Sequence, residues 1–136
     1  MHRIPRIFAP LALAAIVLGL AAAAAAAERR GWELIGERVV SDRVDHDTIV
    51  VTRAEGTFKA VQVRVLERPV QFRSMKIHFG NGDVQDVELR NVIPAGGKSR
   101  VIDIEGHDRV IKTIEFVYDA QALGGRTARV RVFGKN

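Results

Sequence analysis

The sequence predicts an all-β protein: a single antiparallel β-sandwich of about eight strands, jelly-roll-like or Ig-like, after an N-terminal signal peptide. Three observations lead to this prediction. From Trp32 onward, β-branched and aromatic residues occur in short runs. Turn residues separate these runs at intervals of about 8–12 residues, which is typical of an antiparallel sandwich or barrel. No stretch of the mature part keeps the 3.6-residue apolar period of a helix.

The N-terminal segment has the pattern of an export signal. The first six residues include two arginines, a mostly apolar stretch follows, and residues 21–27 are all alanine. This order of positive, apolar and small residues is typical of a secretory signal peptide. We therefore expect a signal peptide over residues 1–27, one domain over residues 28–136, and a periplasmic or secreted bacterial protein. The alternative is a retained membrane anchor, because residues 7–27 are long enough to span a bilayer.

The composition argues against several classes of function. The chain has no cysteine, which excludes disulfides, thiolate metal sites and cysteine nucleophiles. Of its 21 Lys and Arg, Arg3 and Arg6 belong to the leader, so the rest carries 19 basic and 16 acidic side chains, a net charge of +3. This excess is small for a nucleic-acid-binding protein. We expect no nucleic-acid partner, and no cofactor other than the calcium considered below.

The first half of the mature part contains four runs with strand character. The first is rich in branched and aromatic side chains, and the second is a run of Thr, Ile and Val. The third alternates valines with polar residues, and the fourth alternates apolar with polar residues up to a Gly-Asn-Gly turn. Such alternation indicates a sheet packed on one face. These expected strands are Trp32–Val40, Thr48–Arg53, Thr57–Glu67 and Val70–Phe79.

The second half contains four more runs. The first follows the Gly-Asn-Gly turn, and the second lies between two glycine-containing loops. The third is a long run of β-branched and aromatic residues, and the last alternates arginine with valine. β-branched and aromatic residues fit the half-buried surface of a sheet. These expected strands are Val84–Arg90, Ser99–Glu105, Val110–Tyr118 and Arg126–Phe133.

The Gly-Asn-Gly turn predicts a hairpin, because Asn and Gly tolerate positive φ. A three-residue loop over Asn81–Asp83 places Ile77 opposite Val87 in the core. On the outer face the same register places His78 opposite Asp86, an opposite-charge pair that stabilises a sheet. A two-residue loop mixes the two faces, so we expect the three-residue loop.

Five segments carry a resemblance to a known family: residues 32–36, 47–51, 79–82, 99–103 and 109–118. Their strand-and-turn patterns are similar to those of a family of small exported bacterial proteins classed only as a domain of unknown function. The resemblance covers most of residues 32–134. It implies export and a β-sandwich-like fold, and it supplies no catalytic residues.

One loop between expected strands is rich in oxygen ligands. Asp42, Asp45 and Asp47 lie close together there, beside His46. Calcium binds carboxylate oxygens of such loops, although the spacing differs from that of an EF-hand. The alternative is a solvated turn in which the aspartates accept hydrogen bonds from nearby backbone amides. We carry Asp42, Asp45 and Asp47 forward as a candidate calcium site.

The last expected strand has a basic outer face. Arg126, Arg129 and Arg131 lie on or next to it, and their positive charge would attract an anionic partner. The alternative is that these charges protect an exposed edge strand from pairing with other chains. We carry the three arginines forward as a candidate binding surface.

These observations predict a non-enzymatic module that binds or scaffolds a component of the bacterial cell envelope. An envelope protein or an anionic glycan is the expected partner, with membrane contact only through the leader. One alternative is a carbohydrate-binding-like module with structural calcium, although the chain has only one Trp and one Tyr for stacking on sugar rings. Another is an envelope hydrolase, although no serine lies in a G-x-S-x-G motif. We predict no catalytic residue.

Overall fold

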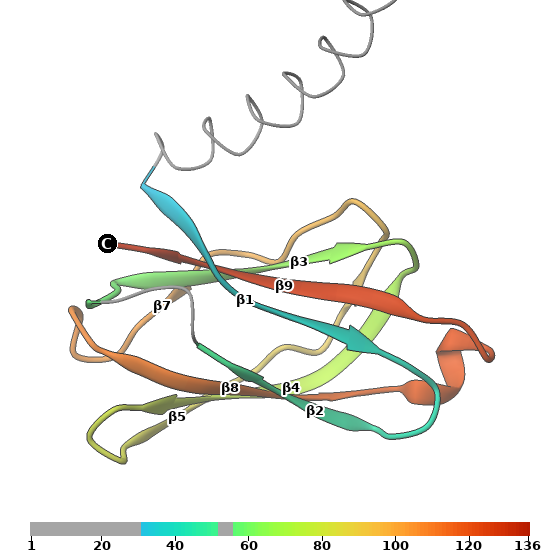
Figure 1. Cartoon of the computed structure of the whole chain (residues 1–136), viewed down its shortest axis with the longest axis horizontal. Helices are drawn as coiled ribbons and strands as arrows, with labels where there is room; N and C mark the ends of the chain where they lie inside the picture. The colour runs from blue at the N-terminus through green and yellow to red at the C-terminus, as the bar shows by residue number, and fades with distance from the viewer. Residues whose placement is uncertain (1–30, 52–55) are drawn as a thin grey trace, which may run out of the picture. The chain divides into compact units, whose positions relative to one another are not determined.

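Two antiparallel sheets lie face to face in the described part of the chain, residues 31–51 and 56–136 (Figure 1). The coordinates are a computed structural model. Glu33–Asn136 form one compact unit, and the expected β-sandwich is confirmed. The predicted signal peptide over residues 1–27 lies outside the described residues. Among those that are described, no helix is long and apolar enough to cross a membrane.

The first sheet joins the beginning of the fold to its end. Its strand order is β1, β9, β3, β7. β3 and β9 pair antiparallel along the whole length of β3, from Ala60 opposite Lys135 to Leu66 opposite Arg129. Because β9 lies between β1 and β3, the edges of this sheet are β1 and β7. The bounds are β1 Trp32–Val40, β9 Ala128–Lys135, β3 Ala60–Leu66 and β7 Ile102–Asp103.

The second sheet is built around the long central strand β4. Its order is β2, β8, β4, β5, and the short strand β6 also pairs with β4. β6 pairs near the start of β4, with Val70 opposite Ile93, whereas β5 pairs nearer its end. The bounds are β2 His46–Val50, β8 Ile111–Tyr118, β4 Val70–Phe79, β5 Val84–Val87 and β6 Val92–Ile93.

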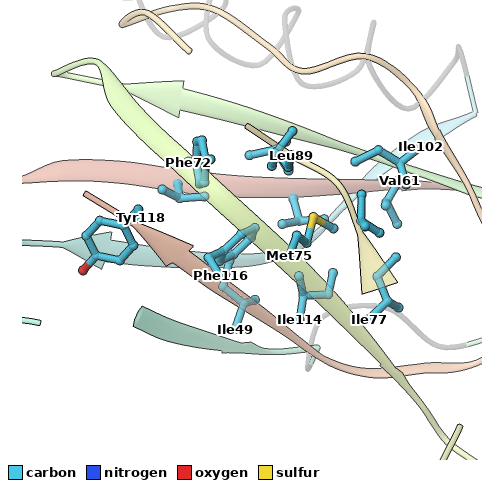
Figure 2. Close-up of a cluster of buried hydrophobic side chains, with 14 of the residues drawn as sticks. Ile49, Val61, Phe72, Met75, Ile77, Leu89, Ile102, Ile114, Phe116 and Tyr118 are labelled. Atoms are coloured by element: carbon cyan, nitrogen blue, oxygen red, sulfur yellow. The ribbon is translucent and has the colours of Figure 1, made fainter. Parts of the chain in front are cut away.

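Apolar side chains from both sheets fill the space between them. Figure 2 shows Val61 of β3 and Ile102 of β7 opposite Met75 of β4 and Ile114 of β8. All four are at most 2% exposed. The alternation of valines in β3 is therefore explained by a buried face, as the sequence predicts. Further contributions come from Phe72 and Phe116, whose ring centroids are 5.6 Å apart in a tilted arrangement.

The hairpin between β4 and β5 has a different register from the one expected. Its loop has three residues but lies one position earlier, because the backbone N–H of Phe79 donates to the carbonyl of Asp83 at 2.9 Å. Ile77 is thus opposite Gln85, and His78 is opposite Val84. The expected pairing of His78 with Asp86 is wrong, and the His78 Nε2 atom lies 3.2 Å from Glu115 Oε2 on β8 instead.

Candidate functional site

Three hollows of the described surface lie near one end of the sandwich. At this end β3 turns into β4, and the 3₁₀ helix η2, Ala120–Leu123, connects β8 to β9 (right side of Figure 1). β6 lies beside the start of β4 at the same end. Connections that are far apart in the sequence therefore contribute side chains to one place.

The first hollow has a volume of about 440 Å³ and carries two arginines. Arg68 comes from the turn between β3 and β4, and Arg126 comes from the segment between η2 and β9. The lining of the hollow also includes Gln71 and the apolar side chains of Pro69, Val92 and Leu123. Among the described residues that line this hollow, none is acidic, so their net charge is positive.

A tight turn positions Arg68. The N–H of Arg68 donates to the carbonyl of Leu66 at 3.0 Å, so the chain reverses within three residues. Glu67, at the centre of this turn, has a φ of 79°. A γ-turn with positive φ is rare and strained, above all for a residue other than glycine. The chain therefore bears a local energetic cost immediately next to Arg68.

A second turn positions Arg126. Helix η2 ends at Gly124, which has a left-handed φ of 59°, and Gly125 follows with a φ of 77°. Glycine adopts this conformation without the steric penalty of a side chain. The N–H of Arg126 then donates to the carbonyl of Leu123 at 3.1 Å. The two glycines direct the chain back toward β9 and leave Arg126 beside the hollow.

A second hollow, of about 370 Å³, adjoins the first. Gln71 borders both, and Arg73 and Arg90 supply the charge of the second. Its remaining lining residues are Phe72, which is 2% exposed, and Ser74. The second hollow therefore repeats the character of the first: its described lining residues include two arginines and polar hydrogen-bonding groups but no acidic side chain.

A third hollow, of about 340 Å³, has the opposite character. It shares Arg73 with the second hollow but is also lined by Asp45 and Asp119. The Arg73 Nη2 atom lies 3.6 Å from Asp119 Oδ2. These two carboxylates make the third hollow unfavourable for anions. The positive surface therefore ends at Arg73.

The structure separates the three arginines predicted as a binding surface. Arg126 lines the first hollow, but Arg129 and Arg131 lie on the outer face of the first sheet and contact Glu37 of β1. Arg129 Nη1 lies 2.6 Å from Glu37 Oε1, and Arg131 Nε lies 2.7 Å from Glu37 Oε2. Partial burial raises the pKa of Glu37, but the hydrogen bonds from Arg131 and Arg129 outweigh it and hold that pKa below its usual value. Arg129 and Arg131 therefore both form ion pairs with Glu37.

The alternative explanation of these arginines as protection of an edge strand is wrong. β9 lies between β1 and β3, so it has no exposed edge. Its charged face arises because every second residue of β9 points away from the core. On β1, Glu37 balances part of this charge.

The three candidate calcium ligands have separate environments. Asp47 is 8% exposed and accepts hydrogen bonds from Arg38 Nε at 3.0 Å and from the Tyr118 hydroxyl at 2.7 Å. Asp45 accepts a hydrogen bond from the N–H of Ala120 at 3.2 Å, and Asp42 is exposed. In residues 31–51 and 56–136, no three His, Cys, Asp or Glu side chains are grouped to hold a metal ion. The calcium site stays a prediction.

Burial explains the chemistry of Tyr118. Its side chain is fully buried, and desolvation raises the pKa of the phenol. The adjacent Asp47 carboxylate raises this pKa further, because it accepts a hydrogen bond from the protonated hydroxyl and would repel the phenolate. Tyr118 is therefore a core residue whose hydroxyl group is hydrogen-bonded.

Most of the residues that line the two cationic hollows carry no signal of a binding site in the sequence alone. None of Arg68, Arg73 and Arg90 is predicted as a binding residue from the sequence. Arg68 and Arg126 have one feature in common that the sequence shows: each is adjacent to turn residues. These are Pro69 for Arg68 and the pair Gly124-Gly125 for Arg126. Arginine in loops at one end of a sandwich indicates a binding surface only once the fold brings the loops together.

Comparisons with known proteins identify a family and a fold. The sequence profile of a family described as "Domain of unknown function (DUF2541)" matches residues 11–134. No match was found among curated proteins. A solved structure described as "Structural and functional characterization of Pseudomonas aeruginosa AlgX" is similar over 74% of this chain, with a TM-score of 0.51 and 13% sequence identity. The chain corresponds to 26% of that protein, and at this identity the likeness shows the fold alone.

Proposed function

The chain belongs to the DUF2541 family, and we propose that it is a non-enzymatic binding module of the bacterial cell envelope that holds an anionic partner at the first hollow. The observation that carries this proposal is the convergence of Arg68 and Arg126 on one hollow without an acidic neighbour in its lining. Arg129 and Arg131 provide the contrast within the same chain, because Glu37 already binds both.

Charge and geometry both favour binding of an anion here. Each guanidinium group offers a planar fork of N–H donors that fits a carboxylate or phosphate, and it keeps its charge at physiological pH. Among the described residues, no acidic side chain forms an ion pair with Arg68 or Arg126. A partner can therefore bind Arg68 and Arg126 without the loss of an ion pair inside the protein.

The lining of the first hollow supports binding rather than catalysis. It contains arginines, an amide and apolar side chains. General acid–base catalysis needs a group that exchanges protons near the working pH, and none of these residue types does so. The pattern of the leader supports the envelope location, because positive, apolar and small residues occur in the order of a secretory signal.

Two single-charge variants test the proposal against a matched control. Arg68→Gln and Arg126→Gln each remove one positive charge from the hollow. Lys59→Gln removes one from an exposed residue before β3, at the other end of that strand. The protein would be purified from cells that express the full chain, and its melting temperature measured with dextran sulfate, polygalacturonate and neutral dextran. A partner that binds only the folded state raises the melting temperature.

We expect the polyanions, but not neutral dextran, to stabilise the wild type and Lys59→Gln. Each hollow variant should bind about tenfold more weakly or worse, as expected for loss of one charge-assisted hydrogen bond. The proposal fails if no polyanion raises the melting temperature. It also fails if Arg126→Gln responds in the same way as Lys59→Gln.

A further inference from the structure

The two cationic hollows share a wall. Gln71, an exposed residue on β4, borders the first hollow on one side and the second hollow on the other. Two arginines lie beyond it in each direction: Arg68 and Arg126 in the first hollow, and Arg73 and Arg90 in the second. Arg73 also forms an ion pair with Asp119 at 3.6 Å, but its side chain is 61% exposed. The surface therefore presents two pairs of guanidinium groups in series rather than one cluster.

We propose that these two hollows form one groove that binds neighbouring units of a linear acidic glycan whose sugars carry carboxylates. This proposal rests on the proposed function and adds the class of ligand and its length. Each arginine pair holds one carboxylate, and Gln71 contacts the link between the two sugar units.

The size and repetition of the hollows favour a ligand with repeated anionic units. Volumes of about 440 and 370 Å³ lie near the lower end of the range of ligand pockets, about 300–1,000 Å³. A ligand with one anionic group would use one arginine pair and leave the other solvated. A ligand with two linked groups engages both, because the second contact forms at a high effective concentration.

The lining favours a glycan over a nucleic acid. Single-stranded nucleic acids bind by stacking their bases on exposed aromatic side chains. Phe72 is the one aromatic residue among the lining residues of the two hollows, and it is only 2% exposed. Gln71 and Ser74 instead offer hydrogen bonds to hydroxyl groups. Apolar side chains such as Val92, which is 54% exposed, offer a surface for the C–H face of a sugar ring.

The third hollow sets one end of the groove. Asp45 and Asp119 line it, next to Arg73, and carboxylates repel an anionic chain. A bound glycan would therefore extend from Arg73 across Gln71 toward Arg126 and leave the molecule on that side. This geometry predicts a short footprint with a defined limit, which can be tested with glycans of increasing length.

Isothermal titration calorimetry with galacturonate monomer, dimer and trimer tests the groove, using protein purified from cells that express the full chain. For the wild type and for Lys59→Gln, we expect the affinity to rise about tenfold or more from monomer to trimer. Arg90→Gln should keep the monomer affinity and lose most of the increase with length, whereas Arg126→Gln should weaken binding at every length. Arg90→Lys, which keeps the charge without the fork, should lie between wild type and Arg90→Gln. Unchanged urea midpoints would show that the variants fold.

Several outcomes would overturn this proposal. Equal affinity for monomer and trimer would refute the groove while the single-hollow function stands. Binding of dextran sulfate or of single-stranded DNA without binding of oligogalacturonate would refute the ligand class. Arg90→Gln with an unchanged length dependence would refute the role of the second hollow. Absence of binding to every polyanion would refute the proposed function as well.

Discussion

The hydrogen bond between Tyr118 and Asp47 should be one of the largest single polar contributions to the stability of this fold. The Tyr118 hydroxyl donates to Asp47 Oδ2 at 2.7 Å, and both residues are buried, at 0% and 8% exposure. Hydrogen bonds to charged groups contribute about 1.5–3 kcal/mol. Tyr118→Phe removes the donor without removing the ring, and Arg38 still donates to Asp47. We therefore expect a loss of about 2 kcal/mol in the free energy of unfolding.

Urea denaturation measures this loss. With a denaturant slope of about 1–3 kcal/mol/M, a loss of 2 kcal/mol lowers the midpoint by about 0.7–2 M. Asp47→Ala should cost at least as much, because it leaves the buried Tyr118 hydroxyl with only the more distant carbonyl of Ser41, at 3.3 Å. The double variant should lose less than the sum of the two, by about 1 kcal/mol or more, because both substitutions remove the same bond.

An additive double variant would refute this reasoning. Distant, independent sites add within about 0.3–0.5 kcal/mol. A sum within that margin would mean that the Tyr118 hydroxyl and the Asp47 carboxylate make no shared contribution to stability. Tyr118→Phe with an unchanged midpoint would lead to the same conclusion.

Two further predictions concern packing and pH. Gly134→Ala should destabilise the protein by about 1–3 kcal/mol, because its Cβ would lie 2.6 Å from Cδ1 of buried Phe58. Adding Phe58→Leu to Gly134→Ala should recover part of that loss. If urea denaturation showed Gly134→Ala to be more stable than the wild type, the close contact between Gly134 and Phe58 would be contradicted. Ionised Glu37 should make the wild type more stable than Glu37→Gln. This difference in the free energy of unfolding should be fully present above pH 4.5, the usual pKa of the group. It should be lost as the pH falls through the lowered pKa of Glu37 in the folded protein. Urea midpoints across acidic pH measure this difference, and a constant difference would exclude ionised Glu37 as its source.

The sequence predicted burial better than it predicted strand pairing. β1 and β4 have the bounds that their patterns predict. The expected strand Ser99–Glu105 is reduced to β7, although Ile102 and Ile104 are buried in the expected alternation. Alternation depends on which side chains face the core, whereas a strand also needs a hydrogen-bonded neighbour along its length. Only the tertiary structure shows where that neighbour ends.

The register of the β4–β5 hairpin shows a second limit of the sequence. The observed register and the expected one differ by two residues, which keeps every side chain on its own face. Hydrophobic alternation therefore cannot distinguish them. What favours the observed register is a contact beyond the hairpin: buried Gln85 donates to the Asp103 carbonyl at 2.9 Å and accepts from the Glu105 N–H at 2.9 Å. Local charge pairing could not reveal these partners.

The candidate site was even less accessible to sequence reasoning. The sequence groups Arg126 with Arg129 and Arg131, because all three lie on or next to one expected strand. Strand alternation places the last two on the outer face beside Glu37, and the turn at Gly124 places Arg126 at the end of the sandwich. Arg129 and Arg131 form ion pairs inside the protein because Glu37 lies beside them in the fold, although it is far from them in the sequence. No local pattern contains that information.

The position of β9 has a consequence for how the molecule is made. Among the strands that the structure describes, β9 comes last in sequence order, yet it is the shared neighbour of β1 and β3 in the first sheet. During synthesis, β1 and β3 therefore emerge long before the strand that joins them. Non-local pairing of this kind slows folding, and the first sheet cannot close until Ala128–Lys135 has been synthesised. A nascent chain stalled before Ala128 would present two unpaired strand edges, which are prone to aggregation and are surfaces to which chaperones bind.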